Sequence, residues 1–174
     1  MNIRSTKGFT LIELLIVVAI IGIIAAIAVP GLIRARMSGN EASAIGSIRS
    51  VNTAQHIYAS SAAQGSYATS LAILGTRCGV NGTGFLPPDI ANAVGGIKSG
   101  YVFAIDASVG AAGPNDCNGT ASRTAYLATA TPVRVGITGG RSFISNEAST
   151  IYGVVTGQGV AATVAAMLPA NAIQ

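Results

Sequence analysis

An unbroken apolar segment at residues 9–33 constrains this chain more than any other feature of its sequence. It reads FTLIELLIVVAIIGIIAAIAVPGLI, and its one ionisable side chain belongs to Glu13. As a helix, a segment of this length spans about 37 Å, which exceeds the roughly 30 Å hydrocarbon core of a bilayer. Basic residues flank it on both sides: Arg4, Lys7, Arg34 and Arg36. The segment therefore predicts a membrane-spanning helix whose orientation is not set by charge alone.

The composition of the whole chain agrees with burial in lipid or against other copies of itself. Half of the 174 residues are apolar, 9% are charged and the mean hydropathy is +0.57. About 25% charged residues is usual for a soluble protein, and disorder requires a more charged, less apolar chain. The net charge of +4 comes from scattered basic residues without an aromatic stripe, so no specific nucleic-acid site is expected.

Considered as residue types alone, the apolar segment leaves several interpretations open. A secretory signal peptide would be cut after Ala28, at the A-x-A pattern of residues 26–28. A plain single-span anchor would be retained. Both interpretations leave Glu13 unexplained, although a carboxylate in a bilayer costs free energy and usually marks a function.

The heptapeptide KGFTLIE at residues 7–13, followed by the apolar stretch to Pro30, resembles the start of a type IV prepilin. The resemblance implies a leader at residues 1–8, cut between Gly8 and Phe9 by a prepilin peptidase that then methylates the Phe9 amine. It also implies that the Glu13 carboxylate attracts the Phe9 amine of a neighbouring subunit and sets the register of assembly. Such pairing is physically reasonable, because an unpaired buried charge is costly and a paired one is tolerated.

Gly22 and Pro30 divide the apolar segment. Proline removes a helical hydrogen bond and glycine weakens the helix, so both favour a local disturbance. The resemblance implies a stretched, partly melted backbone between them in an assembled fibre. A simple kinked helix is the alternative.

Beyond the apolar segment, the sequence predicts an α+β fold: a long N-terminal helix packed on a small antiparallel sheet, the ladle fold of type IV pilins. Helical spacing of apolar residues extends the first helix to about residue 62, with residues 9–33 as its membrane half and residues 34–62 as its amphipathic half. Polar residues, Gln55 among them, fall between the apolar positions of the second half.

The rest of the chain reads as a loop, a sheet and a tail. Residues 63–98 read as a loop with one short helix near residues 67–74. Residues 99–156 form the expected sheet domain of three or four strands, at residues 100–106, 124–135, 141–145 and 150–155. Residues 157–174 form a tail of uncertain order.

Cys78 and Cys117 are the only cysteines. A single pair beyond a membrane segment favours a disulfide formed in an oxidising compartment, with two free buried thiols as the alternative. The closed loop would stabilise the fold by about 3–4 kcal/mol in the chain-entropy model. No catalytic residue, metal site or cofactor is expected, because no known motif is present and the acidic residues are dispersed.

The resemblance implies a structural subunit that waits in the inner membrane and then polymerises with copies of itself into an extracellular helical fibre. Expected partners are the prepilin peptidase, a cytoplasmic assembly ATPase, an inner-membrane platform and minor pilins. Adhesion, twitching motility and DNA uptake are the expected roles. A type II secretion pseudopilin is the nearest alternative, although Glu13 argues against the tip-type pseudopilins that lack it. A soluble secreted binding protein cut after Ala28 is a more distant alternative.

Overall fold

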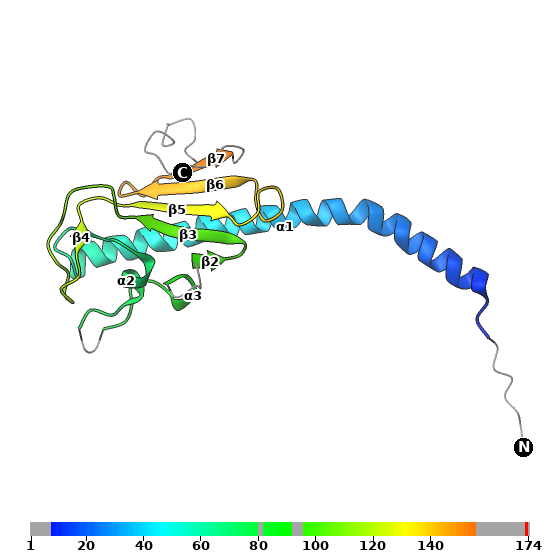
Figure 1. Cartoon of the computed structure of the whole chain (residues 1–174), viewed down its shortest axis with the longest axis horizontal. Helices are drawn as coiled ribbons and strands as arrows, with labels where there is room; N and C mark the ends of the chain where they lie inside the picture. The colour runs from blue at the N-terminus through cyan, green and yellow to red at the C-terminus, as the bar shows by residue number, and fades with distance from the viewer. Residues whose placement is uncertain (1–7, 80–81, 92–95, 156–172, 174) are drawn as a thin grey trace, which may run out of the picture. The chain divides into compact units, whose positions relative to one another are not determined.

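The computed structural model describes residues 8–79, 82–91, 96–155 and 173 (Figure 1). It divides into two compact units, Met1–Arg36 and Met37–Gln174, here called the N-terminal and C-terminal units. The first helix, α1 (Leu11–Ser61), contributes residues to both. Its observed bounds lie within two residues of the helix predicted from the sequence.

The N-terminal unit consists, in its described part, of residues 8–10 and the start of α1. Helix α1 continues through Gly22 and Pro30, with the side chains of residues 11–36 exposed. Among the described residues, α1 is the one helix long and apolar enough to cross a membrane.

The C-terminal unit is built around an antiparallel sheet of five strands in the order β2-β3-β5-β6-β7. The strands are β2 (Ile97–Lys98), β3 (Tyr101–Asp106), β5 (Leu127–Pro132), β6 (Arg141–Asn146) and β7 (Ile151–Val155). A smaller pair joins β1 (Tyr67–Ala68) to β4 (Ser122–Arg123), and two short helices are α2 (Leu71–Gly75) and α3 (Pro88–Ala91). The long helix and the antiparallel sheet confirm the predicted α+β class.

The four predicted strands are present, and their alternation has the expected cause. Tyr101 and Phe103 face the core from β3, and Ile105 is partly buried against the same cluster. The predicted hairpin between β6 and β7 also forms, with the register Ser145 to Ile151. The two-residue strand β2 raises the sheet to five strands, one more than the largest number predicted.

The short helix predicted near residues 67–74 is partly wrong. Tyr67 and Ala68 form β1, and the helix begins only at Leu71, where Ser70 Oγ caps it by accepting the Ile73 N–H at 3.3 Å. Pairing with β4 decides the matter, because a tertiary contact readily overrides the weak helix preference of a short segment.

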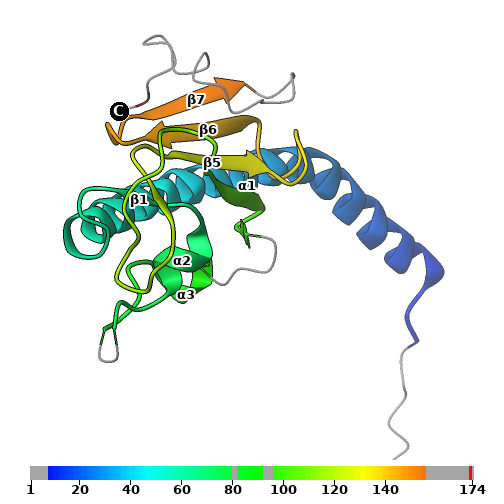
Figure 2. The same ribbon diagram turned by 60° about the vertical axis from the view of Figure 1, so that its left-hand side comes forward.

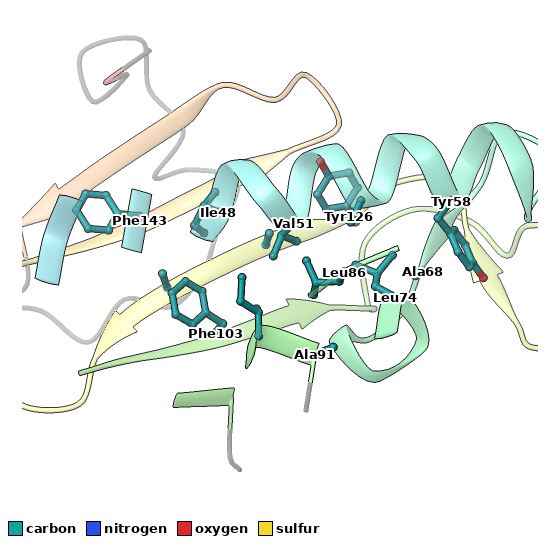
Figure 3. Close-up of a cluster of buried hydrophobic side chains, with 14 of the residues drawn as sticks. Ile48, Val51, Tyr58, Ala68, Leu74, Leu86, Ala91, Phe103, Tyr126 and Phe143 are labelled. Atoms are coloured by element: carbon teal, nitrogen blue, oxygen red, sulfur yellow. The ribbon is translucent and has the colours of Figure 1, made fainter. Parts of the chain in front are cut away.

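The core lies where the sheet covers one side of α1 in the C-terminal unit, an arrangement visible in both views (Figures 1 and 2). From the helix, Ile48, Val51 and Tyr58 point into a cluster that includes Phe103 and Phe143 (Figure 3). These residues are each at most 4% exposed. This packing covers the amphipathic face of α1.

Gln55 was expected on the polar face of α1, and the structure corrects this. Its side chain is fully buried, and its amide pairs with both backbone groups of Ala68: the Ala68 N–H donates to Oε1 at 2.8 Å and Nε2 donates to the Ala68 carbonyl at 2.9 Å. A buried amide is tolerated when both of its polar ends are satisfied. Gln55 thus acts as a partner of β1 within the core.

The predicted tail at residues 157–174 lies outside the described residues, except for Ile173. The Ile173 N–H donates to the Ile151 carbonyl at 2.7 Å, at the start of β7.

Candidate functional site

Glu13 lies in the first turn of α1 and closes a reciprocal hydrogen-bond pair with Thr10. The Glu13 N–H donates to Thr10 Oγ1 at 3.3 Å, and Glu13 Oε2 accepts from the Thr10 N–H at 3.0 Å. The Thr10 hydroxyl also donates to the same carboxylate oxygen at 2.6 Å. This is a capping box, in which two side chains satisfy backbone donors that a helix start leaves free.

The T-x-x-E spacing of residues 10–13 carried this information in the sequence, where it was interpreted only as part of the prepilin motif. Thr10 is therefore a site residue that the sequence analysis missed. The cap holds the negative charge of Glu13 at the positive end of the helix macrodipole, where an anion is favoured.

The predicted cleavage point lies immediately before this cap. Gly8 is exposed, and Phe9 is 80% exposed. A new amine at Phe9 would therefore start four residues before a carboxylate that is already fixed in position. The rest of the predicted leader, residues 1–7, lies outside the described residues.

The apolar surface that follows is the largest exposed feature of the N-terminal unit. Large aliphatic side chains project from α1, with Ile12 66%, Ile27 77% and Leu32 69% exposed. An apolar surface of this extent requires lipid or another protein to cover it. Gly22 and Pro30 lie inside the continuous helix, and the expected melting between them concerns an assembled fibre.

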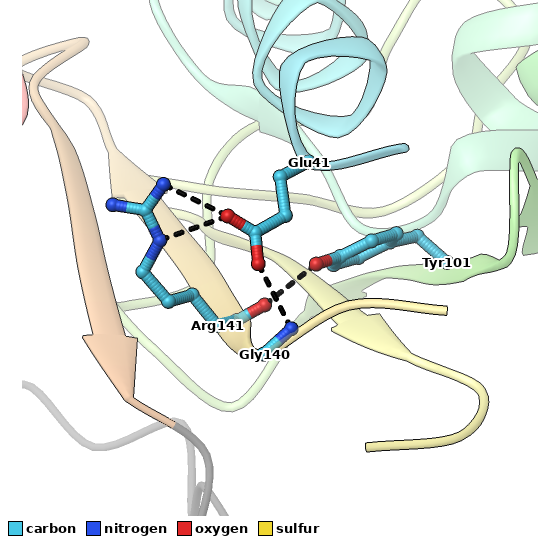
Figure 4. Close-up of polar contacts among 4 residues, drawn as sticks. All are labelled: Glu41, Tyr101, Gly140 and Arg141. Carbon is cyan, nitrogen blue, oxygen red and sulfur yellow. Dashed lines mark hydrogen bonds and ion pairs between the residues drawn. The ribbon is translucent and has the colours of Figure 1, made fainter. Parts of the chain in front are cut away.

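A second polar cluster fastens α1 to the sheet within the C-terminal unit (Figure 4). Glu41 Oε2 accepts from Arg141 Nε at 2.9 Å and Nη2 at 2.8 Å, while Glu41 Oε1 accepts the Gly140 N–H at 2.8 Å. The Tyr101 hydroxyl donates to the Arg141 carbonyl at 2.8 Å. Burial, with a smaller effect of the Glu41 charge, raises the pKa of Tyr101 to about 12.

The opposite end of the same helix segment is tied to the loop that carries the second cysteine. The structure joins Cys78 and Cys117 in a disulfide whose Cα atoms lie 5.8 Å apart. The Cys117 N–H donates to the Ala62 carbonyl at 3.0 Å, and the Tyr58 hydroxyl donates to Asp116 Oδ2 at 2.9 Å. Burial first, and then the Asp116 carboxylate, raise the pKa of Tyr58 well above its ordinary value.

A third contact joins α1 to the hairpin of β6 and β7. Asn52 Nδ2 donates to Ser145 Oγ at 2.8 Å, and the Tyr126 hydroxyl donates to Asn52 Oδ1 at 3.1 Å. Burial raises the pKa of Tyr126. No local sequence pattern marks Asn52 or Asp116 as partners, because their contacts join segments more than 50 residues apart.

Within the described ranges, no group of three His, Cys, Asp or Glu side chains is arranged to hold a metal ion. The polar clusters of the C-terminal unit each connect α1 to the strands or loops around it. The arrangement as a whole therefore offers a fastened C-terminal unit and an uncovered apolar helix.

Known proteins match the chain at its N-terminal end. Residues 3–29 match the family model of the prokaryotic N-terminal methylation motif. The chain is 60% identical over 38 residues to the type IV wide pilus major component PilA4 of Thermus thermophilus, covering 22% of this chain and 29% of that protein. It is 51% identical over 49 residues to the type IV major pilin protein PilA of Myxococcus xanthus, covering 28% of this chain and 22% of that protein. Each match spans less than a third of the relative, and no solved structure matches the chain.

A methylation motif, an apolar helix and an antiparallel sheet packed on the continuation of that helix define the pilin class of proteins. Both relatives are named as components of type IV pili. Together with the motif, they support the identification of this chain as a type IV pilin.

Proposed function

We propose that this chain is a structural subunit of a type IV pilus, polymerised through the apolar helix at residues 9–33. The observation that carries the proposal is the exposed apolar surface of α1, placed directly after a methylation motif. The names of the two relatives, a wide pilus major component and a major pilin protein, favour a pilus subunit over a type II secretion pseudopilin.

In this proposal the subunit is cut between Gly8 and Phe9 by a prepilin peptidase and methylated at Phe9. It waits in the inner membrane until an assembly ATPase and an inner-membrane platform add it, with minor pilins, to an extracellular fibre. Adhesion, motility and DNA uptake are the roles open to such a fibre. The chain itself contributes structure and no catalysis.

The energetics explain why extraction from the membrane must be coupled to assembly. Burying one large aliphatic side chain away from water is worth about 1.5–3 kcal/mol, and α1 exposes many of them between residues 9 and 33. Moving such side chains from lipid to protein gains little, because lipid is equally apolar. The helix therefore leaves the bilayer only if neighbouring subunits cover it at once.

Glu13 supplies the polar term in this assembly. Thr10 fixes one of its carboxylate oxygens, and the charge can then pair with the methylated Phe9 amine of a neighbour. A neutral partner would leave the amine uncompensated in an apolar fibre core, which is costly.

N-terminal sequencing and intact mass of the protein from the cell envelope test the processing step. A start at Phe9 with one added methyl group is expected. A start at Val29 would show an ordinary signal peptide and would overturn the proposal.

Fibre yield from the Glu13→Gln variant tests the assembly step. Glutamine also serves at this position of a capping box, so the variant removes the charge while keeping the helix start. We expect normal processing at Phe9 and a strong loss of fibres. The Glu41→Gln variant, which removes one carboxylate from the C-terminal unit, is the matched control. Normal fibre yield from Glu13→Gln would contradict the role given to its charge.

A further inference from the structure

The connection between β5 and β6 presents an exposed aliphatic patch on the C-terminal unit. We call residues 133–140 the proximal loop. Val133 is 47%, Val135 57% and Ile137 56% exposed, so three aliphatic side chains within five residues face solvent. Clustered exposed aliphatic residues mark an interaction surface more often than scattered ones do.

The loop is closed by its own hydrogen bonds, so its fold holds the aliphatic side chains outward. The Arg134 N–H donates to Thr138 Oγ1 at 3.0 Å, and the Thr138 N–H donates to the Arg134 carbonyl at 2.9 Å. The Gly136 N–H donates to the Gly139 carbonyl at 2.9 Å. The left-handed backbone of Gly136, with φ at 77°, completes the turn.

The loop is also fastened to the part of α1 that lies nearest in sequence to the apolar segment. Asn40 Nδ2 donates to the Thr138 carbonyl at 2.9 Å, and Glu41 accepts the Gly140 N–H. Asn40 follows Ile33, the last residue of the apolar segment, by seven positions. Seven residues span about 10 Å as a helix and at most about 25 Å in any conformation. A bilayer that holds the apolar segment is therefore always close to the loop.

The charges near the loop favour an anionic surface. Arg134 is exposed within the loop, and Arg34 and Arg36 are exposed between the apolar segment and Asn40. Aliphatic residues interspersed with arginine are typical of surfaces that lie in the headgroup region of membranes.

A second copy of the chain offers a poorer complement for these arginines. Among the carboxylates of the described C-terminal unit, those of Glu41 and Asp89 are held in ion pairs, and that of Asp116 is buried. Asp106 and Glu147 remain for a neighbour, on a chain whose net charge is +4. Repulsion between copies therefore opposes a contact through the loop, whereas an anionic lipid surface attracts it.

We propose that the proximal loop docks on the anionic lipid surface of the membrane while the subunit is anchored and before it polymerises. This inference rests on the proposed function, because it requires the apolar segment to lie in a bilayer. The aliphatic side chains enter the interfacial layer and Arg134 contacts lipid phosphates.

Tryptophan fluorescence tests the proposal well, because the chain contains no tryptophan. The full chain is reconstituted in vesicles of phosphatidylethanolamine and phosphatidylglycerol (about 3:1 by moles, to give the anionic surface the proposal needs), with or without brominated acyl chains that quench tryptophan. Three variants carry one reporter each: Val135→Trp in the loop, Ile57→Trp as a control and Ile21→Trp in the apolar segment. Ile57 is the matched control because it is 48% exposed and lies on the same unit, 17 residues beyond Asn40.

We expect strong quenching of the Ile21→Trp reporter, clear quenching of Val135→Trp and at most weak quenching of Ile57→Trp. Adding Arg134→Gln to Val135→Trp should lower the ratio of docked to undocked loop about fivefold in these vesicles, and little in pure phosphatidylcholine.

Each failure has a distinct meaning. An unquenched Ile21→Trp would overturn membrane anchoring and with it the proposed function. A quenched Ile21→Trp with Val135→Trp no more quenched than Ile57→Trp would overturn docking of the loop alone. A blue shift of Val135→Trp that ignores bromine and grows with the ratio of protein to lipid would show that a second copy covers the loop, and would also overturn the proposal.

Discussion

Replacing Tyr58 with phenylalanine removes one hydroxyl from the contact between α1 and the loop that carries Cys117. The ring of Tyr58 is 1% exposed, and its hydroxyl donates to Asp116 Oδ2 at 2.9 Å. Asp116 Oδ1 is occupied separately by the backbone N–H groups of Asn118 and Thr120, at 2.9 and 2.7 Å. The variant therefore leaves one buried carboxylate oxygen without its donor while the loop keeps its own turn.

A hydrogen bond to a charged group contributes about 1.5–3 kcal/mol. The equilibrium constant for unfolding should thus rise roughly 10- to 150-fold in Tyr58→Phe, since about 1.4 kcal/mol corresponds to a factor of ten. The aromatic ring itself stays in place, so no cavity term adds to this loss.

The same hydroxyl gives the effect a pH dependence. A tyrosine in the unfolded chain titrates near pH 10, whereas the pKa of folded Tyr58 is raised. Above about pH 10 the unfolded state has released a proton that the folded state still holds, so the free energy of unfolding falls as pH rises. The difference between wild type and Tyr58→Phe should be full below about pH 9 and should shrink above about pH 10.

Near-UV circular dichroism of the full chain in detergent micelles measures this difference during denaturant unfolding. All five tyrosines lie in the C-terminal unit, so the tyrosine signal reports on that unit. Tyr152→Phe, at a partly buried position, is the control and should change the free energy of unfolding by less than about 0.5 kcal/mol. A Tyr58→Phe loss below that value, or one that adds without coupling to the loss from Asp116→Asn, would refute the reasoning.

Three further perturbations of the C-terminal unit can be followed by the same assay. Glu41→Gln should cost about 0.5–1.5 kcal/mol, an effect that about 1 M salt reduces, because the ion pair is partly exposed; an unchanged midpoint would show that the pair is energetically neutral. Gly139→Ala should cost about 1–3 kcal/mol, because the added methyl group collides with the buried ring of Tyr101, whereas Gly46→Ala, which has open space in α1, should be neutral or stabilising. Replacing both disulfide cysteines with serine should cost about 3–4 kcal/mol, and a smaller loss than that of Tyr58→Phe would show that the loop is held mainly by its hydrogen bonds.

The parts of the fold that could be predicted are those that depend on local periodicity. The apolar run and the helical spacing after it predicted α1, and the alternation of Tyr101, Phe103 and Ile105 predicted β3. These patterns repeat over many residues, so one exception does not change the prediction. The strand β1 was missed because its two residues owe their conformation to β4, more than 50 positions away.

The polar contacts of the core were invisible in the sequence for a related reason. Gln55 looked like a surface residue, because amides are usually exposed and nothing nearby in the chain indicates that Ala68 will meet it. Thr10 is different. Its capping role follows from a local four-residue pattern and was therefore open to prediction. The processing and assembly roles of Phe9 and Glu13 remain predictions, since they concern an enzyme and a neighbouring subunit.

The disulfide between Cys78 and Cys117 has a mechanical consequence when the two ends of the chain are pulled apart. The covalent path crosses the bond and bypasses a sequence separation of 39 residues. At about 3.5 Å per residue, the bond withholds roughly 135 Å of contour length from the unfolded chain. A subunit stretched under tension therefore reaches its limit that much earlier. When the tension is released, the segment between the cysteines refolds from a closed ring whose end at Cys117 starts beside its partner, Ala62.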